Sequence, residues 1–226
     1  MRNIMKEVIL DTETTGLSVK EGHRIVEIGC IELDNLIPTK KIFHCFLNPG
    51  RKVSESAFKV HGYSDEFLSD KKSFKQISED FLKFIDGKKI IIHNAEFDIS
   101  HINNELKLIG KKELDNSNVV DTLTLAREKY PGSNASLDAL CKRFRIDNSR
   151  REKHNALIDC ELLSKVYINL LDQKEPSLNF STQNIVEENL KNISNQDYSK
   201  KVVPISKEEF ELHKSFIKSK MKKNFF

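Results

Sequence analysis

Short apolar segments alternate with polar breaks over the first quarter of the chain. Three of these segments, at residues 6–10, 24–33 and 41–47, are rich in β-branched and apolar residues, and Gly, Pro and Asn separate them. This composition favours three β-strands, and their spacing favours a meander in which neighbouring strands run antiparallel. We therefore expect the chain to begin with an antiparallel sheet.

The apolar period changes from that of a strand to that of a helix at residue 73. Over residues 73–86 apolar side chains recur at helical spacing, and Ser73 with Gln76 matches a capping box. Gly87 is then expected to end this helix. The apolar positions are Phe74, Ile77, Phe81, Phe84 and Ile85.

Strands and helices alternate after this helix. Residues 89–92 predict a short buried strand, Asn94 is expected to cap the next helix, and Gly110 is expected to end it. The elements expected beyond it are, in order, a short strand at residues 119–120 and helices near residues 122–130, 136–144 and 156–170. This order predicts an α/β domain with a mixed sheet flanked by helices, over residues 1–172.

The texture of the sequence changes after Leu171. Residues 173–200 are rich in Asp, Gln, Lys, Glu, Ser and Asn with few apolar anchors, which predicts a flexible linker. In residues 201–226, Ser206 with Glu209 forms a second capping box, and a narrow apolar stripe follows it. A short terminal helix is expected there, and such a helix is marginally stable by itself.

Composition excludes several classes of protein. With 226 residues the chain is long enough for one domain and an appendage, and its apolar runs are only a few residues long, which excludes a membrane-spanning protein. The N-terminus lacks the apolar stretch of a secretory signal, so a cytoplasmic protein is expected. The four cysteines form no CxxC pair, which favours buried thiols over disulfides or zinc fingers. The net charge of +3 gives no clear sign of a nucleic-acid partner.

Two acidic residues follow the first predicted strand. Asp11 and Glu13 are two positions apart, so their side chains project from one face of the strand, roughly 6.5–7 Å apart. This spacing is suited to a pair of divalent cations, as in two-metal phosphoryl-transfer sites. The backbone amides of Thr14, Thr15 and Gly16, which follow, are candidates to contact a phosphate.

Two further acids are expected to face the sheet from helices. Asp98 lies in the first turn of one helix, four residues before Ile102, and Asp159 lies four residues before Leu163 in another. Four buried carboxylates would repel one another, and bound Mg²⁺ or Mn²⁺ would remove that repulsion. Oxygen ligands favour these ions over zinc. Replacing Asp11 or Asp159 is accordingly expected to leave metal-free stability equal or higher.

His154 is a candidate general base. It precedes Asp159 by five residues, so the two side chains share one site only if His154 lies at or before the start of the helix. The polar segment 148–153 supports a loop at that place. With an ordinary pKa of about 6.5, a histidine there can take a proton from an attacking water.

These motifs resemble those of a known family. DTETTG (11–16), HNAEFD (93–98) and HNALID (154–159) are similar to the motifs of the DEDD exonuclease superfamily, in the branch whose fifth catalytic residue is a histidine. Segments 24–33, 60–68 and 136–151 are further similar to the family of proofreading epsilon subunits of bacterial DNA polymerase III. The resemblance implies a ribonuclease H-like fold and a 3′–5′ exonuclease.

The resemblance also implies roles for individual residues. Asp11, Glu13 and Asp159 would hold one metal, and Asp11 would bridge to a second with help from Asp98. His154 would be the general base, and a 5′-nucleoside monophosphate would leave from a DNA 3′ end. The residues implied to contact the substrate are Asp11, Glu13, Thr14, Leu17, His61, Asn94 and Asp159.

The resemblance also implies partner proteins, and the sequence departs from the family pattern at two positions. Residues 202–216 resemble a tail that binds the polymerase catalytic (alpha) subunit, and the resemblance implies the theta subunit and the sliding clamp as further partners. Two positions depart from the family pattern. Ser56 stands where the family has a carboxylate, and residues 175–180 begin with Glu175 where the clamp-binding motif has Gln.

Two other functions remain open on the sequence. An exoribonuclease would use the same five acid and base residues, although the long tail argues against it. A non-catalytic scaffold of the polymerase would tolerate loss of any of the five, and all five are present.

Overall fold

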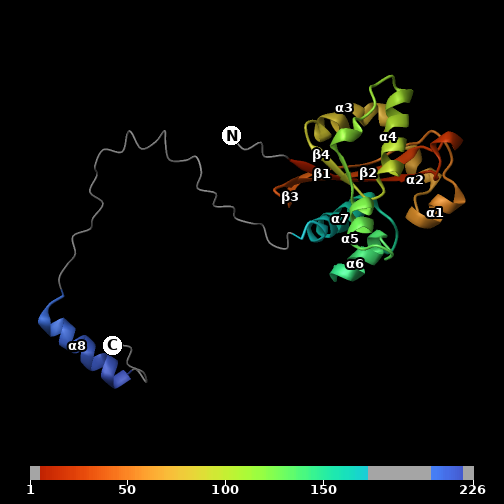
Figure 1. The fold of residues 1–226 in the computed structure, drawn as a ribbon. Helices are drawn as coiled ribbons and strands as arrows, with labels where there is room; N and C mark the ends of the chain where they lie inside the picture. Colours follow the sequence, from red (N-terminus) through yellow and green to blue (C-terminus); the bar gives the residue numbers. More distant parts are fainter. Residues whose placement is uncertain (1–5, 173–204, 221–226) are drawn as a thin grey trace. The chain divides into compact units, whose positions relative to one another are not determined.

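Five strands form one mixed sheet, whose order across the sheet is β3-β2-β1-β4-β5 (Figure 1). The computed structural model describes residues 6–172 and 205–220. The strands are β1 (Glu7–Thr14), β2 (Ile25–Asp34), β3 (Ile37–Phe46), β4 (Lys89–Ile92) and β5 (Val119–Asp121). The first three are antiparallel, and β4 and β5 run parallel to β1. The expected meander and mixed sheet are thus confirmed.

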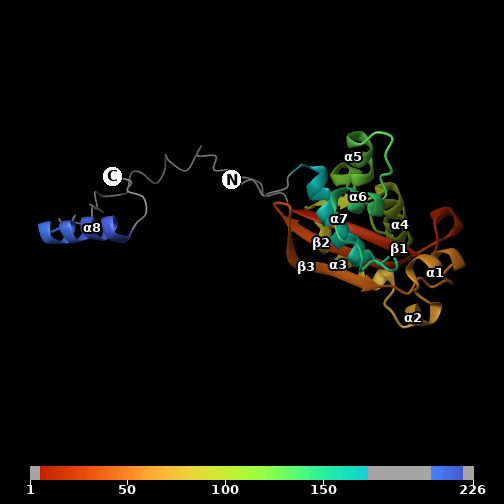
Figure 2. The same cartoon turned by 90° about the horizontal axis from the view of Figure 1, so that it is seen from below.

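Helices cover both faces of this sheet (Figures 1 and 2). Helices α3 and α4 lie on one face, and α5, α6 and α7 lie on the other. The helices of the domain are α1 (Glu55–His61), α2 (Asp65–Ser69), α3 (Phe74–Ile85), α4 (Ala95–Leu108), α5 (Thr122–Lys129), α6 (Leu137–Phe144) and α7 (Ala156–Leu170). Two single turns of 3₁₀-helix, η1 (Val19–Glu21) and η2 (Asn116–Asn118), complete it.

The central strand β1 supplies side chains to both apolar cores. Leu10 packs with Phe81 of α3 on one face, whereas Ile9 packs with Tyr167 of α7 on the other. Successive strand residues point to opposite faces, so Asp11 and Glu13 continue the face of Ile9 and lie on the side of α7. Cys30, Cys141 and Cys160 are buried as thiols, whereas Cys45 is only half-buried, and the described residues contain no disulfide.

The helix boundaries agree with the sequence at most ends. The capping box of Ser73 and Gln76 is present at α3. Asn94 does begin α4, but with a left-handed φ of 71° and without a capping hydrogen bond from its side chain, so the expected cap is absent. Helices α1 and α2 have no counterpart among the sequence-based expectations. Ser54 and Ser64 cap them.

The N-terminal turn of α7 lies directly on β2. A Cβ atom on Gly29 would lie 2.6 Å from the carbonyl carbon of Ala156, so only glycine permits this approach. Asn155 caps the helix, because its side-chain oxygen accepts a hydrogen bond from the Ile158 amide at 3.0 Å. The position of Asp159 in the first turn is therefore set by contacts with the sheet.

Within its described residues 205–220, the C-terminal unit contains one helix, α8 (Lys207–Lys220). The predicted capping box is present, since Ser206 and Glu209 each accept from the other's backbone amide at 3.2 and 3.1 Å. The predicted linker 173–200, the clamp-like segment 175–180 and the apolar residues Val202 and Val203 lie outside the described residues. Within the described ranges, no helix combines the length and apolar character needed to cross a membrane.

Candidate active site

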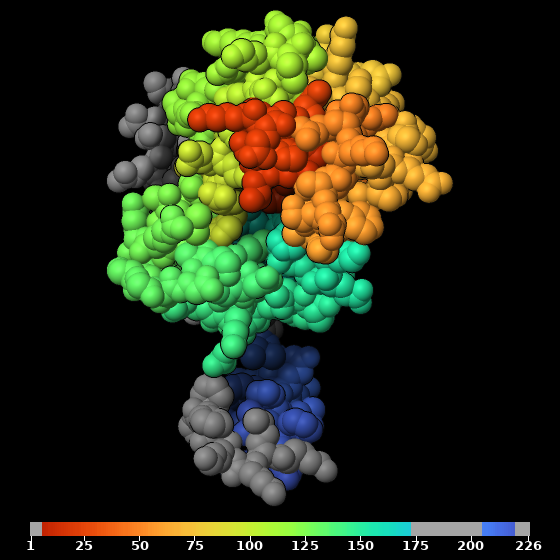
Figure 3. All heavy atoms as spheres, turned by 90° about the vertical axis from the view of Figure 1, so that its right-hand side faces the viewer, coloured from red at the N-terminus to blue at the C-terminus, as the bar shows by residue number. Residues whose placement is uncertain are grey.

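A cleft of about 520 Å³ opens at the carboxyl end of β1. Figure 3 shows this end of the domain, where the red and orange segments that follow β1 border green and teal segments around a hollow. The cleft gathers every residue that the sequence singled out as a site residue. They are Asp11, Glu13, Thr14, Leu17, His61, Asn94, Asp98, His154 and Asp159.

The two acids of β1 reach the cleft from adjacent same-face positions. Asp11 is half-buried and Glu13 is 8% exposed. The pairing of β1 with β2 shifts register between Glu13 and Thr14, which ends the regular strand at the cleft.

Asp98 is fixed in place by a residue that the sequence did not indicate. The backbone amide and hydroxyl of Thr12 both donate to Oδ1 of Asp98, at 2.9 and 2.7 Å. Asp98 is 3% exposed and lies in the first turn of α4, where the helix dipole favours an anion. The only sequence signal for Thr12 was its position between Asp11 and Glu13.

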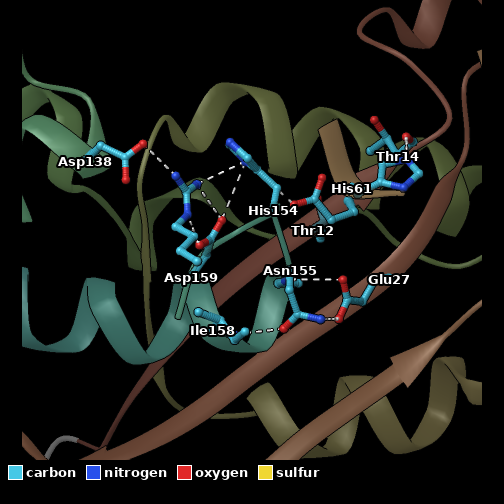
Figure 4. Close-up of polar contacts among 12 residues, drawn as sticks. Thr12, Thr14, Glu27, His61, Asp138, His154, Asn155, Ile158 and Asp159 are labelled. Carbon is cyan, nitrogen blue, oxygen red and sulfur yellow. Dashed lines mark hydrogen bonds and ion pairs between the residues drawn. The ribbon is translucent and has the colours of Figure 1, made fainter. Parts of the chain in front are cut away.

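Arg151 binds Asp159, and sequence reasoning missed it. Its Nε and Nη2 donate to the two oxygens of Asp159 at 2.5 and 2.8 Å, and its Nη1 donates to Asp138 at 2.8 Å (Figure 4). Arg151 is 7% exposed at its side chain. The consecutive basic residues Arg150 and Arg151 before the HNALID motif were the available signal. Among Asp11, Glu13, Asp98 and Asp159, Asp159 is therefore the one acid with a cationic partner at hydrogen-bond distance in the described residues.

His154 lies just before α7, as the site required. Its Nδ1 is 3.7 Å from Asp159 Oδ2 and 3.9 Å from Glu13 Oε1. Arg151 Nη2 lies 3.0 Å from Nδ1, and since a guanidinium only donates, Nδ1 carries a lone pair. Neutral His154 accordingly holds its proton at Nε2.

The tightest group of ligand atoms differs from the expected metal set. Atoms of Glu13, His154 and Asp159 lie within 4.8 Å of one another. Asp11 and Asp98 line the same cleft but are not members of this group. Carboxylate oxygens dominate the five side chains, and this donor set fits Mg²⁺ or Mn²⁺.

Burial and nearby carboxylates raise the pKa of Asp11, Glu13 and Asp98. Burial raises the pKa of Asp11 well above its ordinary value, and the charges of Asp98, Glu13 and Asp159 raise it further. Burial, followed by the charge of Asp159, raises the pKa of Glu13 to about 8. Burial raises the pKa of Asp98 to about 7, against the hydrogen bonds from Thr12. A divalent cation would relieve this repulsion, so the electrostatics also fit a metal site.

His154 is shifted in the opposite direction. Burial and the neighbouring Arg151 guanidinium lower its pKa, which keeps the imidazole neutral at neutral pH.

The residues expected to contact substrate differ in what they can offer. Leu17 is 83% exposed at the cleft. His61 lies in the cleft wall, but both ring nitrogens are engaged, with the Thr14 carbonyl at 3.2 Å and the Tyr63 amide at 3.0 Å. The amide of Thr15 donates to the Arg24 carbonyl at 2.8 Å, so the prediction that it contacts a phosphate is wrong for this arrangement.

Two other predicted positions lie at the cleft without a defined contact. The Asn94 backbone amide donates to Asp121 at 3.0 Å, and its side chain is exposed. Ser56, which replaces a family carboxylate, lies in the cleft wall and shares a hydrogen bond with Ser54 at 3.0 Å.

Solved structures share this fold. Exonuclease X in complex with 5′ overhanging duplex DNA aligns with a TM-score of 0.57 at 25% identity, over 74% of this chain and 92% of that one. The nuclease domain of 3′hExo, a DEDDh family member bound to rAMP, aligns with a TM-score of 0.65 at 15% identity, over 76% and 94%. The expected ribonuclease H-like fold is confirmed.

The curated relatives match over almost the full length of the chain. Residues 8–167 match the model of a family described as Exonuclease. DNA polymerase III subunit epsilon of Rickettsia felis is 46% identical over 96% of this chain and 98% of its own length. The subunits of the same name from Buchnera aphidicola (subsp. Schizaphis graminum) and Salmonella typhimurium are 41% and 40% identical, over 96% and 94% of this chain and 98% and 92% of their own lengths. The chain is therefore an exonuclease that belongs to the family of DNA polymerase III epsilon subunits.

Proposed function

We propose that this exonuclease proofreads DNA by removing nucleotides from the 3′ end, with two divalent cations, and releases 5′-nucleoside monophosphates. The observation that carries the proposal is the convergence of four carboxylates and one neutral histidine in a single cleft. Among these four carboxylates in the described residues, Asp159 alone accepts hydrogen bonds from a cationic side chain, that of Arg151. The lack of such partners for the other three supports bound cations as their partners.

The carboxylates would divide between two cation positions. Glu13 and Asp159 would hold one cation together with Asp11, since Glu13 and Asp159 approach each other closely. Asp11 would also face the second cation, with Asp98 beyond it. Bound Mg²⁺ or Mn²⁺ would supply Lewis-acid stabilisation of the charge that develops on the scissile phosphate.

His154 would accept the proton of the attacking water. Its Nδ1 faces Glu13 and Asp159, so Nδ1 is the nitrogen directed to the reaction centre. Arg151 must leave Nδ1 before that nitrogen can accept a proton. The lowered pKa keeps His154 in the basic form at neutral pH.

Residues at the cleft rim would hold the terminal nucleotide. The exposed side chain of Leu17 would stack on its base, and Thr14 and Asn94 would lie beside it. Both nitrogens of His61 are already hydrogen-bonded, so His61 would contact the nucleotide only through the face or edge of its ring. It would also hold the Thr14 carbonyl in place.

The C-terminal tail would join the enzyme to the polymerase alpha subunit. Helix α8 exposes Phe210, Leu212 and Phe216, which are suited to a partner's apolar groove. We propose the theta subunit and the sliding clamp as further partners, and Glu175 in place of Gln is expected to weaken the clamp contact.

A degradation assay tests the proposed chemistry. The full-length chain with Mg²⁺ should shorten a 5′-labelled DNA strand from its 3′ end, release mononucleotides, and cut a mispaired terminus faster than a paired one. Melting a mismatch costs less than melting a matched pair, which explains the preference. Equal rates on both termini, or a preference for RNA, would favour the exoribonuclease; no cleavage at all would favour a scaffold.

A further inference from the structure

A fifth buried acid, Glu27, lies beside the cleft and outside the proposed metal set. It is paired with Glu13 across β1 and β2, so the two side chains emerge on the same face of the sheet. Glu27 is 0% exposed. The Glu27 carboxylate adds to the repulsion at Glu13. A buried acid in this position therefore needs contacts that stabilise it.

Four donors saturate the Glu27 carboxylate. Oε1 accepts from His44 Nε2 at 2.7 Å and from Asn155 Nδ2 at 2.8 Å. Oε2 accepts from the Tyr63 hydroxyl at 2.8 Å and from the Ala156 amide at 3.0 Å. With two donors on each oxygen, Glu27 has no capacity left to bind a cation.

Two of these donors belong to the start of α7. Ala156 is the first residue of the helix, and Asn155 is its cap, whose oxygen accepts from Ile158 while its nitrogen donates to Glu27 (Figure 4). An anion at a helix N-terminus is also favoured by the helix dipole. Gly29, two residues further along β2, allows the Ala156 backbone to rest on the strand.

The anchored turn carries two of the proposed functional groups. His154 immediately precedes Asn155, and Asp159 lies in the first turn of α7. The other two Glu27 donors come from β3 and from the segment after α1, so the carboxylate ties three parts of the domain to the turn. A displacement at Glu27 is transmitted to His154 and Asp159 through only one to three residues of backbone.

We infer that Glu27 is a positioning residue for the nuclease reaction: it holds the N-terminal turn of α7 so that His154 and Asp159 meet Glu13. This inference rests on the proposed function of that site. Glu27 touches neither substrate nor cation in this scheme, and it acts through Asn155 and Ala156.

Replacement of Glu27 by its amide tests this role in the full-length chain. In Glu27→Gln, either orientation of the amide turns an NH₂ group toward one α7 donor that cannot accept, the Asn155 Nδ2 group or the Ala156 amide, and so displaces it. We expect kcat on single-stranded DNA to fall by about tenfold to a hundredfold, because small misplacements of catalytic groups have effects of this size. KM should change by less than about twofold, since the rim residues Leu17, Thr14 and Asn94 are not among the donors to Glu27.

Glu32→Gln provides a matched control. Glu32 is a second buried glutamate of β2, 2% exposed, and it pairs with Lys88 at 2.7 Å on the opposite face of the sheet. Its loss should lower the melting temperature without lowering kcat. An equal fall of kcat in both variants, or an unchanged kcat in Glu27→Gln, would overturn the inference.

A milder variant covers the case in which Glu27→Gln fails to fold. Asn155→Ser keeps a capping oxygen but removes the donor to Glu27, so α7 should still form. We expect a fall of kcat, and in the double variant the two losses should not add. Additive losses, or full activity of Asn155→Ser, would contradict the coupling.

A spectroscopic measurement separates this inference from the proposed function. In metal-free protein, NMR signals of the His154 ring and the Asp159 amide should move in Glu27→Gln and stay in place in Glu32→Gln. Unmoved signals would overturn the positioning role whatever the activity. Conversely, full activity of Asp11→Asn would refute the proposed site while leaving the NMR result intact.

Discussion

The domain contains two sets of largely buried acidic side chains, and the two sets differ in the groups that bind their carboxylates. The cleft carboxylates are Asp11, Glu13, Asp98 and Asp159, and the anchoring glutamates are Glu27, Glu32 and Glu105. The anchoring glutamates are matched by donors: Arg24 binds Glu105 through two contacts of 2.6 Å, and Lys88 binds Glu32 at 2.7 Å. Glu13 and Asp11 have no such match.

The pKa values of Glu32 and Glu13 depend on the partners of these two carboxylates as well as on burial. Burial alone would raise the pKa of Glu32, but the hydrogen bond and charge of Lys88, with Lys41 and Lys6, lower it. Burial raises the pKa of Glu13 to about 8, and the nearby acids add to the effect. Burial alone therefore does not distinguish Glu13 from Glu32, whereas the lysines around Glu32 and the acids around Glu13 do.

The largest expected effect is the loss of activity in Asp11→Asn. Nucleotide release with Mg²⁺ should fall by at least about a thousandfold, because a ligand shared by both cations is removed. The metal-free melting temperature should stay equal or rise, since a repelling charge disappears. Calorimetry without metal and the DNA degradation assay measure the two effects.

Asp159→Asn should differ from Asp11→Asn in its metal-free stability. It should also lose activity, yet its metal-free stability should fall because the buried Arg151 loses the charged acceptor of two of its hydrogen bonds and keeps only Asp138 as an ionic partner. The contacts of Arg151 thus argue against the sequence-based expectation that replacing Asp159 leaves metal-free stability equal or higher. A fall in stability for Asp11→Asn as large as that for Asp159→Asn would remove the distinction between the two sets.

Glu105→Ala should produce the opposite balance of effects. The variant leaves Arg24 without its bidentate acceptor, and the free energy of unfolding should fall by about 2–3 kcal/mol, a value reduced for the partial exposure of Arg24. The kcat of the folded enzyme should be unchanged. Denaturant unfolding gives the first quantity, and a large loss of kcat at full folding would place Glu105 with the functional acids.

A smaller effect is expected for Arg151→Gln. Arg151 occupies both oxygens of Asp159, so it competes with a cation for that carboxylate. Its removal should tighten Mn²⁺ binding by about tenfold, the size of one charged hydrogen bond. Calorimetric titration checks this, with Arg150→Gln as control. The Arg150 side chain is 77% exposed, and its ion pair is a long one of 3.9 Å with Glu161, outside the site. Weaker Mn²⁺ binding in Arg151→Gln alone would refute competition.

The sequence predicted the parts of the fold that have a regular period. The strands are runs of β-branched and apolar residues, the long helices α3, α4 and α7 carry apolar residues at intervals of three to four, and the structure confirms both. Helices α1 and α2 have seven and five residues, too short to show a period. The paired Ser-x-x capping positions, Ser54 and Ser64, were their only local signal.

The site was predictable where chemistry lies in short motifs and not where it depends on contacts across the fold. Asp11, Glu13, Asp98, His154 and Asp159 stand in compact motifs, and all five line the cleft. The pairing of Arg151 with Asp159 depends on the path of the loop before α7. The role of Glu27 depends on the pairing of β2 with β1 and on α7, although a charged residue inside an apolar strand was a visible sign.

The pH dependence of metal-free stability tests most directly whether the cleft carboxylates are uncompensated. Glu13 and Asp98, with pKa values raised to about 8 and about 7, hold protons in the folded state that the unfolded chain has released. Their contribution to stability is full at acid pH and is lost as pH rises through those values. Burial lowers the pKa of His61, His93, His101 and His154, an opposite effect that is complete near neutral pH.

The measurement is the melting temperature of the full-length chain from about pH 7 to about pH 8.5, with and without Mg²⁺. Without metal the melting temperature should fall across this range, and Mg²⁺ should remove the fall and raise the whole curve. Glu13→Gln should flatten the metal-free curve. A metal-free melting temperature that stays level or rises with pH, together with no effect of Mg²⁺, would contradict a cleft whose carboxylates are held for cations.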